Sequence, residues 1–199
     1  MKSIEENILA LIKAKPRGLL LFPEEYKKIA SSDAVRQALK RLAEKNEIKR
    51  IAQGIYVRPK LSELIGEVLP RAEEVAIGIA KRDRIRIIPT GSFALNALGL
   101  STQVPMKLVY LTDGSPREIR IGNRSIKFKK TTPKTLSIKG VTCALVVQAL
   151  RELGKENITD SEVIKIVDLL KKEKKEVLQH DVVLVPDWMR KIMEKALHE

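Results

Sequence analysis

The order of hydrophobic and polar positions in the first sixty residues predicts three helices followed by a β-hairpin. Ser3 and Glu6 have capping-box spacing at the start of the first helix, and Pro23 suits the first turn of a short second helix. The third helix should extend to about Lys45, because its apolar residues repeat at i, i+3, i+4 and i+7: Val35, Ala38, Leu39 and Leu42. Two β-rich stretches then flank a turn at Gly54.

This order is typical of a winged helix-turn-helix, so residues 1–60 are predicted to form a DNA-binding domain. In that arrangement the third helix enters the major groove, which is wide enough for a helix and presents an unambiguous base pattern. Arginine and glutamine can pair with base edges, whereas lysine holds phosphates. A domain that contacts only protein is the alternative. The residues expected to bind DNA lie on the third helix and the hairpin: Ser32, Arg36, Gln37, Lys40, Arg41, Arg50, Gln53, Tyr56 and Arg58.

The remaining residues, 61–199, are predicted to form a second domain of the α+β class, with a small mixed sheet and C-terminal helices. A short linker helix is expected over 61–69, and a strand-to-helix turn at Gly91-Ser92. A hairpin should cross Gly122-Asn123, and one more strand should cover 136–138. Strand alternation in this hairpin puts Arg120, Lys127 and Lys129 on one face, opposite an apolar face of Ile119, Ile121, Ile126 and Phe128. The apolar runs after Val141 predict helices, and Thr159 and Glu162 have capping-box spacing at the start of one of them.

The positive charge of the chain is concentrated in two blocks. The formal net charge is +13, of which residues 1–60 carry +7 and residues 84–150 carry +9, while the segments between and after them are slightly acidic. Two separate basic surfaces are therefore predicted, each facing a polyanion or an acidic protein. A solvated strand face is the alternative for the second surface, which is centred on the hairpin 117–130: Arg117, Arg120, Arg124, Lys127, Lys129 and Lys130.

Short motifs in both predicted domains resemble the AbiEi family of antitoxins from type IV toxin–antitoxin (abortive-infection) systems. They are Gly54-Ile55-Tyr56 in the wing, and then Gly91-Ser92, Ala94-Leu95, Gly99-Leu100 and Gln103-Val104-Pro105. The resemblance implies a winged helix followed by an antitoxin-type domain. It also implies a transcriptional repressor that binds double-stranded DNA of its own promoter and neutralises a nucleotidyltransferase-like toxin encoded nearby.

A nucleotidyltransferase-like or nucleic-acid-processing enzyme is the main rival, because the Gly91-Ser92 turn resembles the opening of such a core. These enzymes hold paired Mg²⁺ ions with two or three carboxylates. Residues 84–112 contain no acid, and Asp113 and Glu118 are the only acids in 84–150. We therefore expect no catalytic residues, no metal and no cofactor. A plain regulator whose second domain senses a ligand or dimerises is a further alternative, and the oligomeric state is open.

The remaining sequence features indicate a cytoplasmic protein. Cys143 is the one cysteine, which rules out an internal disulfide and favours a small buried side chain. No apolar run approaches the roughly 20 residues of a membrane helix. Glu5 and Glu6 stand where a signal peptide would have its basic end, so we expect neither a leader nor a membrane partner.

Overall fold

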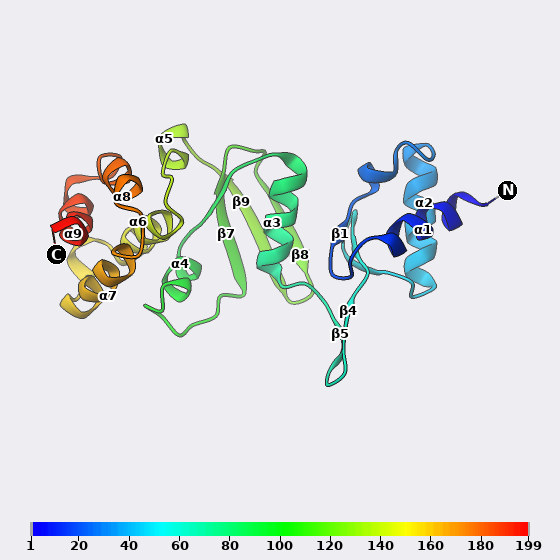
Figure 1. The fold of residues 1–199 in the computed structure, drawn as a ribbon, viewed down its shortest axis with the longest axis horizontal. Coiled ribbons are helices and arrows are strands. Elements are labelled where there is room, and N and C mark those ends of the chain that lie inside the picture. Colours follow the sequence, from blue (N-terminus) through cyan, green and yellow to red (C-terminus); the bar gives the residue numbers. More distant parts are fainter. Residues whose placement is uncertain (1, 199) are drawn as a thin grey trace. The chain divides into compact units, whose positions relative to one another are not determined.

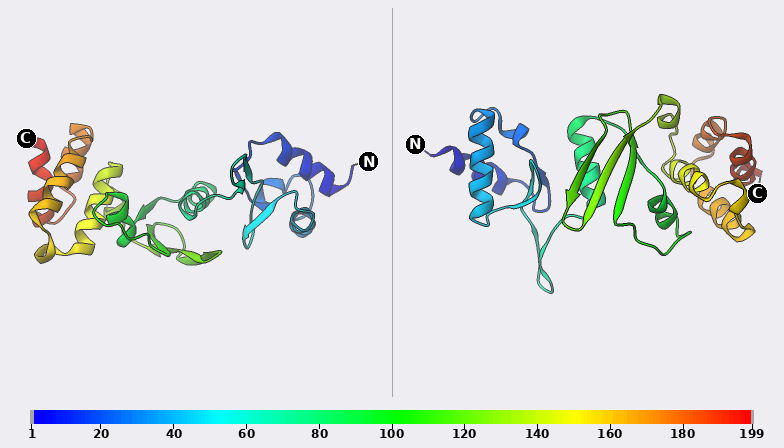
Figure 2. Two further views of the ribbon diagram at one scale, coloured as in Figure 1. Left: turned by 90° about the horizontal axis from the view of Figure 1, so that it is seen from below. Right: turned by 180° about the vertical axis from the view of Figure 1, so that it is seen from behind.

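The computed structural model describes residues 2–198 and divides into two compact units (Figures 1 and 2). The first unit extends to Gly78 and includes Arg120–Gly122; the second holds Ile79–Ile119 and the residues from Asn123 on. Both units combine helices with small sheets, and the last part of the chain is helical, which confirms the α+β class. No helix within the described residues is long and apolar enough to cross a membrane.

The first unit begins with a helix that is capped as predicted. Ser3 N donates to Glu6 Oε2 at 2.7 Å and Glu6 N donates to Ser3 Oγ at 3.2 Å, so both halves of the capping box form. Asn46, after the long helix, has a φ of 58°, as a left-handed helix exit requires. From the N-terminus to the end of the first sheet, the elements are α1 (Ile4–Ala14), β1 (Leu20–Leu21), the 3₁₀ helix η1 (Pro23–Tyr26), α2 (Ser32–Glu44), β2 (Lys49–Ala52) and β3 (Ile55–Val57).

The core of the first unit joins its helices to a three-stranded antiparallel sheet of order β1-β3-β2. Helix α1 packs against α2 (Figure 1). Both helices contribute fully buried side chains, which belong to one cluster with Ile48 and Tyr56: Ile8, Ile12, Val35, Leu39 and Leu42. Because α2 buries one stripe in this cluster, its opposite face is left for solvent or a partner.

The segment predicted as a linker helix is instead a β-hairpin, so that prediction is wrong. Strand β4 (Lys60–Ser62) pairs antiparallel with β5 (Gly66–Val68). Figure 1 shows the two strands as an extended hairpin with its loop at the bottom of the view. A helix would hold Gly66 in its interior at a cost of about 1 kcal/mol. The apolar side chains Leu61, Leu64 and Ile65 are all exposed, so their spacing does not mark a buried helical face.

Substitutions of one exposed leucine in this hairpin and one buried leucine in the core test whether the hairpin packs against the rest of the first unit. Leu64 is 95% exposed, so Leu64→Ser is expected to change the free energy of unfolding by no more than about 0.5 kcal/mol. Leu39 is 0% exposed in the core of the same unit, so Leu39→Ala should lower it by about 3 kcal/mol. Urea denaturation of both variants measures the difference. A large loss for Leu64→Ser would mean that the hairpin is packed against other residues.

The second unit contains a four-stranded mixed sheet of order β6-β7-β9-β8. Strand β7 (Lys107–Thr112) runs antiparallel to β6 (Ile87–Pro89) and parallel to β9 (Arg124–Lys130). The predicted turn at Gly122-Asn123 joins β8 (Arg117–Ile121) to β9, and the predicted short helix after Gly91 is α4 (Ser92–Ala97). One sheet face is closed by buried side chains, with the Tyr110 and Phe128 rings stacked 6.0 Å apart: Leu108, Tyr110, Ile126 and Phe128.

Helices make up the rest of the second unit. Helix α3 (Ala72–Asp83) crosses the division between the units at Gly78. The prediction of a strand at 136–138 is wrong, because a short helix, α5 (Pro133–Leu136), ends there. Pro133 occupies the first turn of this helix, a position that the fixed φ of proline favours. The predicted capping box Thr159–Glu162 is confirmed. The other helices that contribute to one core are α6 (Val141–Leu153), α7 (Asp160–Leu170), α8 (Lys175–Val182) and α9 (Asp187–His198). The short 3₁₀ helix η2 (Lys155–Asn157) follows α6 and has no buried residue.

Candidate nucleic-acid interface

Helix α2 presents a polar face because its apolar stripe is buried. The N-cap is Ser31, whose Oγ accepts from Ala34 N at 3.4 Å, and not Ser32. Val35 and Leu39 lie inside the core, whereas four polar side chains are exposed on the opposite side: Arg36, Gln37, Lys40 and Arg41. The structure thus places these four residues together, as the helical spacing predicted.

The hairpin β2–β3 brings a second set of polar residues to the same place. Its pairing is irregular between Arg50 and Ala52, and the turn follows at Gln53-Gly54. A groove of about 380 Å³ lies between this hairpin, α2 and the start of η1. The predicted residues that line this groove, called here the α2 groove, are Arg36, Gln37, Lys40, Arg50, Gln53 and Tyr56.

The other predicted DNA-binding residues lie outside the groove lining. Ser32 and Arg41 are exposed on α2, at its first turn and at its C-terminal half. Arg58 donates from Nη1 to Lys13 O at 3.2 Å, and this bond connects the end of β3 to α1.

Tyr56 lines the groove but is only 5% exposed and belongs to the core. It therefore forms the floor of the groove, and its hydroxyl is not positioned to contact a base.

Carboxylates weaken the positive field of the α2 groove. Arg36 Nη1 lies 3.5 Å from Asp33, and Lys40 Nζ lies 3.8 Å from Glu44. Such exposed pairs contribute only about 0.2–0.5 kcal/mol on a helix, so either cation can exchange its carboxylate for a phosphate at little cost. Arg50 has no ion pair within residues 2–198, and it is free to meet an anion directly.

The predicted second basic surface is divided between two sides of the sheet. Lys127 and Lys129 alternate with the buried Ile126 and Phe128 along β9. Since β7 and β9 are in parallel register, Lys107 shares the face of Lys127 and Lys129; these three residues are called the lysine face. Arg120 is exposed on β8, in agreement with the predicted alternation.

The other members of that predicted surface lie on the opposite face, so one surface made of all six cations is wrong. Arg124 and Lys130 have the strand parity of Ile126 and Phe128. Arg117 is in contact with Asp83 and places its guanidinium 5.3 Å from the centre of the Phe128 ring. Burial raises the pKa of Asp83, but hydrogen bonds from Arg82 and Arg117 outweigh it and lower that pKa overall. Arg117 therefore supports the sheet and is not available to a partner.

The acids of the second unit are poorly placed for two-metal chemistry. Glu118 lies 3.4 Å from Lys107 at the start of β7, and its pKa is lowered by a hydrogen bond from Ser125 and by the nearby lysines. Asp113 follows the other end of β7 and accepts from Arg86 N at 2.9 Å. Lys107 and Asp113 are six positions apart along the chain, or roughly 20 Å in a strand, whereas paired metals stand only about 4 Å apart.

The turn at Gly91-Ser92 is accounted for by its backbone. Gly91 has a φ of 62°, a conformation that other residues adopt at a cost. The Glu152 carboxylate lies 3.5 Å from the place where a Cβ of Gly91 would be, and its charge would repel a phosphate there. No group of three or more potential metal ligands occurs within residues 2–198. The turn thus connects β6 to α4 without offering an anion site.

A buried polar cluster that the sequence did not reveal lies at the start of α6. The Asp181 carboxylate is 0% exposed and accepts from Lys139 N at 2.9 Å and from Gly140 N at 2.7 Å. His180 Nδ1 lies 2.8 Å from Asp181 Oδ1. Burial, together with the charge of Asp181, raises the pKa of the Cys143 thiol to about 12. A thiol with a raised pKa is protonated at neutral pH, so Cys143 is not poised as a nucleophile.

Residues 7–178 match a protein-family model described as "Family of unknown function (DUF6088)". The matched range includes both the α2 groove and the lysine face. Because the match covers most of the chain, the chain belongs to this family. No curated protein matches the sequence.

Proposed function

We propose that this member of the DUF6088 family is a transcriptional repressor that binds double-stranded DNA of its own promoter. The observation that carries the proposal is the α2 groove, where Arg36, Gln37 and Lys40 of one helix face Arg50 and Gln53 of a hairpin. The order helix, strand, helix, helix and hairpin supports a winged helix-turn-helix with α2 as its recognition helix. Such a repressor acts in the cytoplasm.

The chemistry of the groove supports base reading as well as phosphate binding. Arginine forks onto guanine and glutamine onto adenine, while lysine and the hairpin arginine meet phosphates. The weak pairs of Arg36 and Lys40 with Asp33 and Glu44 would be replaced by phosphate or base contacts on docking. The net charge of +13 adds a general attraction to DNA.

An antitoxin role is the second part of the proposal and rests on the resemblance to AbiEi-family antitoxins together with the lysine face. This face combines Lys107, Lys127 and Lys129 with the half-buried Val109 and Leu111. Apolar side chains between cations favour an acidic protein over a nucleic acid, whose interfaces are more polar. The separation of Asp113 from Glu118 disfavours the rival proposal of a nucleotidyltransferase-like enzyme.

Binding of labelled promoter DNA to the Arg36→Ala variant tests the repressor proposal. If Arg36 contacts a base, the variant should lose about 1–3 kcal/mol of binding free energy, or roughly 5- to 150-fold in affinity, and its preference for promoter over unrelated DNA should fall. Fluorescence anisotropy at fixed salt measures both.

The matched control is Lys13→Ala, which removes one positive charge from α1 outside the groove lining. Its affinity should stay within about twofold of the unaltered protein, because an exposed charge outside the interface contributes only to the general field. Equal affinities for Arg36→Ala, Arg50→Ala and Lys13→Ala would exclude the α2 groove as the DNA interface.

A further inference from the structure

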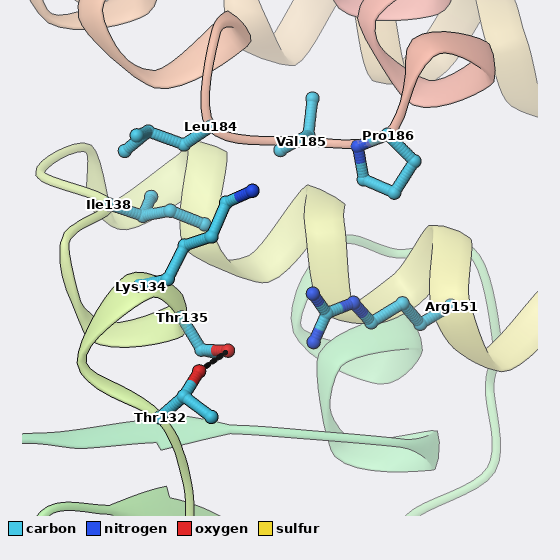
Figure 3. Close-up of a pocket in the computed structure, with 8 residues that line it drawn as sticks. All are labelled: Thr132, Lys134, Thr135, Ile138, Arg151, Leu184, Val185 and Pro186. Atoms are coloured by element: carbon cyan, nitrogen blue, oxygen red, sulfur yellow. Dashed lines mark hydrogen bonds between the residues drawn. The ribbon is translucent and has the colours of Figure 1, made fainter.

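A basic hollow of about 290 Å³ lies in the second unit, away from the residues assigned above (Figure 3). Thr132, Lys134 and Thr135 reach it from the α5 segment, and Arg151 reaches it from α6. The loop Leu184–Pro186, between α8 and α9, closes the side opposite the threonines in Figure 3. Three segments that are distant in sequence therefore meet around one space, called here the Lys134–Arg151 hollow.

The two cations of this hollow have no acidic partners. Within residues 2–198, neither Lys134 nor Arg151 makes a hydrogen bond or ion pair through its side chain, and no carboxylate lines the hollow. Lys191 on α9 differs from them, because its Nζ lies 3.1 Å from Asp187. Two unpaired positive charges facing one space repel each other, and an anion between them would remove that repulsion.

Hydroxyl groups complete the polar side of the hollow. Thr132 Oγ1 and Thr135 Oγ1 lie 3.3 Å apart. In Figure 3 the Arg151 guanidinium points toward the side of the hollow where these two threonines lie. Arginine offers a planar fork of donors, lysine offers a compact charge, and each hydroxyl can donate one proton to an oxygen. Together these groups can surround several oxygens of one ligand.

The number of charges and donors favours a phosphate over a carboxylate. A phosphate monoester carries nearly two negative charges at neutral pH and has three terminal oxygens. It would neutralise both Lys134 and Arg151 and still accept from a threonine, whereas a carboxylate would neutralise one cation and offer two oxygens. The charge count therefore matches a phosphate dianion.

The opposite wall of the hollow is apolar and suits an organic group. Ile138 and Val185 are buried, and Leu184 and Pro186 add further hydrocarbon surface. A volume of about 290 Å³ lies at the low end for small-molecule sites, which limits the ligand to a small molecule. Inorganic phosphate would leave this wall uncovered, so an ester of phosphate fits better.

We propose that the Lys134–Arg151 hollow binds a small organic phosphate monoester. Its phosphate contacts Lys134, Arg151 and the two threonines, and its organic group lies against Leu184–Pro186. The bound ligand connects the α5 segment, α6 and the α8–α9 loop, so it stabilises the second unit. This site is independent of the repressor proposal, because no residue of the α2 groove takes part.

Calorimetric titration of the full chain with phenyl phosphate, orthophosphate and benzoate at 150 mM salt tests the proposal. Phenyl phosphate should bind saturably at one site per chain. Orthophosphate, without the organic group, and benzoate, with one charge, should each bind at least tenfold more weakly. Equal affinity for phenyl phosphate and orthophosphate would overturn the assignment to an ester, and equal affinity for phenyl phosphate and benzoate would overturn the assignment to a phosphate.

Variants of the lining cations show whether binding occurs in this hollow. Lys134→Met and Arg151→Gln should each weaken phenyl phosphate at least tenfold and remove the rise in melting temperature that the ligand causes. Both side chains are exposed, so the ligand-free variants should melt like the unaltered protein. Lys172→Met removes an exposed charge of the same unit outside the hollow and should bind normally. Unchanged binding by both lining variants, or absence of saturable binding, would refute the site.

Discussion

Replacing Asp181 with alanine is expected to lower the free energy of unfolding by about 3–5 kcal/mol, the usual cost of removing one partner from a buried charged contact. The carboxylate is fully buried and accepts from two backbone amides at the start of α6, and alanine would leave those amides without acceptors. Gly140 fits this site closely, since a Cβ there would lie 2.9 Å from Cys143 Sγ and 3.1 Å from Asp181 Oδ2. The amides, the thiol and the carboxylate are therefore closely packed around Gly140.

Urea denaturation and thermal melting of Asp181→Ala measure this loss, which corresponds to a fall of at least about 10 °C for a unit of this size. Asp187→Ala is the matched control, because Asp187 is 69% exposed and pairs with Lys191 only at the surface. Its effect should stay near 0.5 kcal/mol. Asp181→Asn keeps one acceptor oxygen and should lie between the two. Equal losses for Asp181→Ala and Asp187→Ala would show that the buried carboxylate does not support α6.

Patterns within a few residues predicted the local structure well. Both capping boxes, Ser3–Glu6 and Thr159–Glu162, depend on side chains three residues apart, and both form. The apolar repeat of α2 predicted which side chains it exposes, because a helix fixes its faces from its own sequence. Strand alternation likewise predicted that Lys127 and Lys129 lie opposite Ile126 and Phe128.

Features that depend on distant residues were not predictable from spacing. Asp181 accepts from Gly140 N across forty-one positions of the sequence, and Lys134 and Arg151 line one hollow although they lie on different helices. The hairpin β4–β5 was missed for another reason: its leucines and isoleucine remain in solvent, so burial does not select the helix that their spacing suggests. Arg117 was assigned to a basic surface from its charge alone, although Asp83 and Phe128 hold it on the other face.

Loss of toxin neutralisation with intact repression is the expected result for the double variant Lys127→Glu with Lys129→Glu, a prediction that rests on the proposed antitoxin role. Both side chains lie on the lysine face beside Val109 and Leu111, and the α2 groove contains neither residue. Two reversals change the charge of this face by four, which would repel an acidic partner at close range. Growth during co-expression with the neighbouring toxin gene measures neutralisation, and promoter binding measures repression.

The same double variant distinguishes a protein partner from DNA at this face. If the lysine face binds an acidic toxin, the slope of log K against log salt for promoter DNA should match that of the unaltered protein. If it binds DNA, the slope should fall by about 0.9 for each lost phosphate contact, and growth rescue should persist. Glu118→Gln is the matched control, since it removes the carboxylate beside Lys107 and leaves the face more positive, so rescue should be kept. Normal rescue together with normal promoter binding in the double variant would show that these lysines serve only as a solvated strand face.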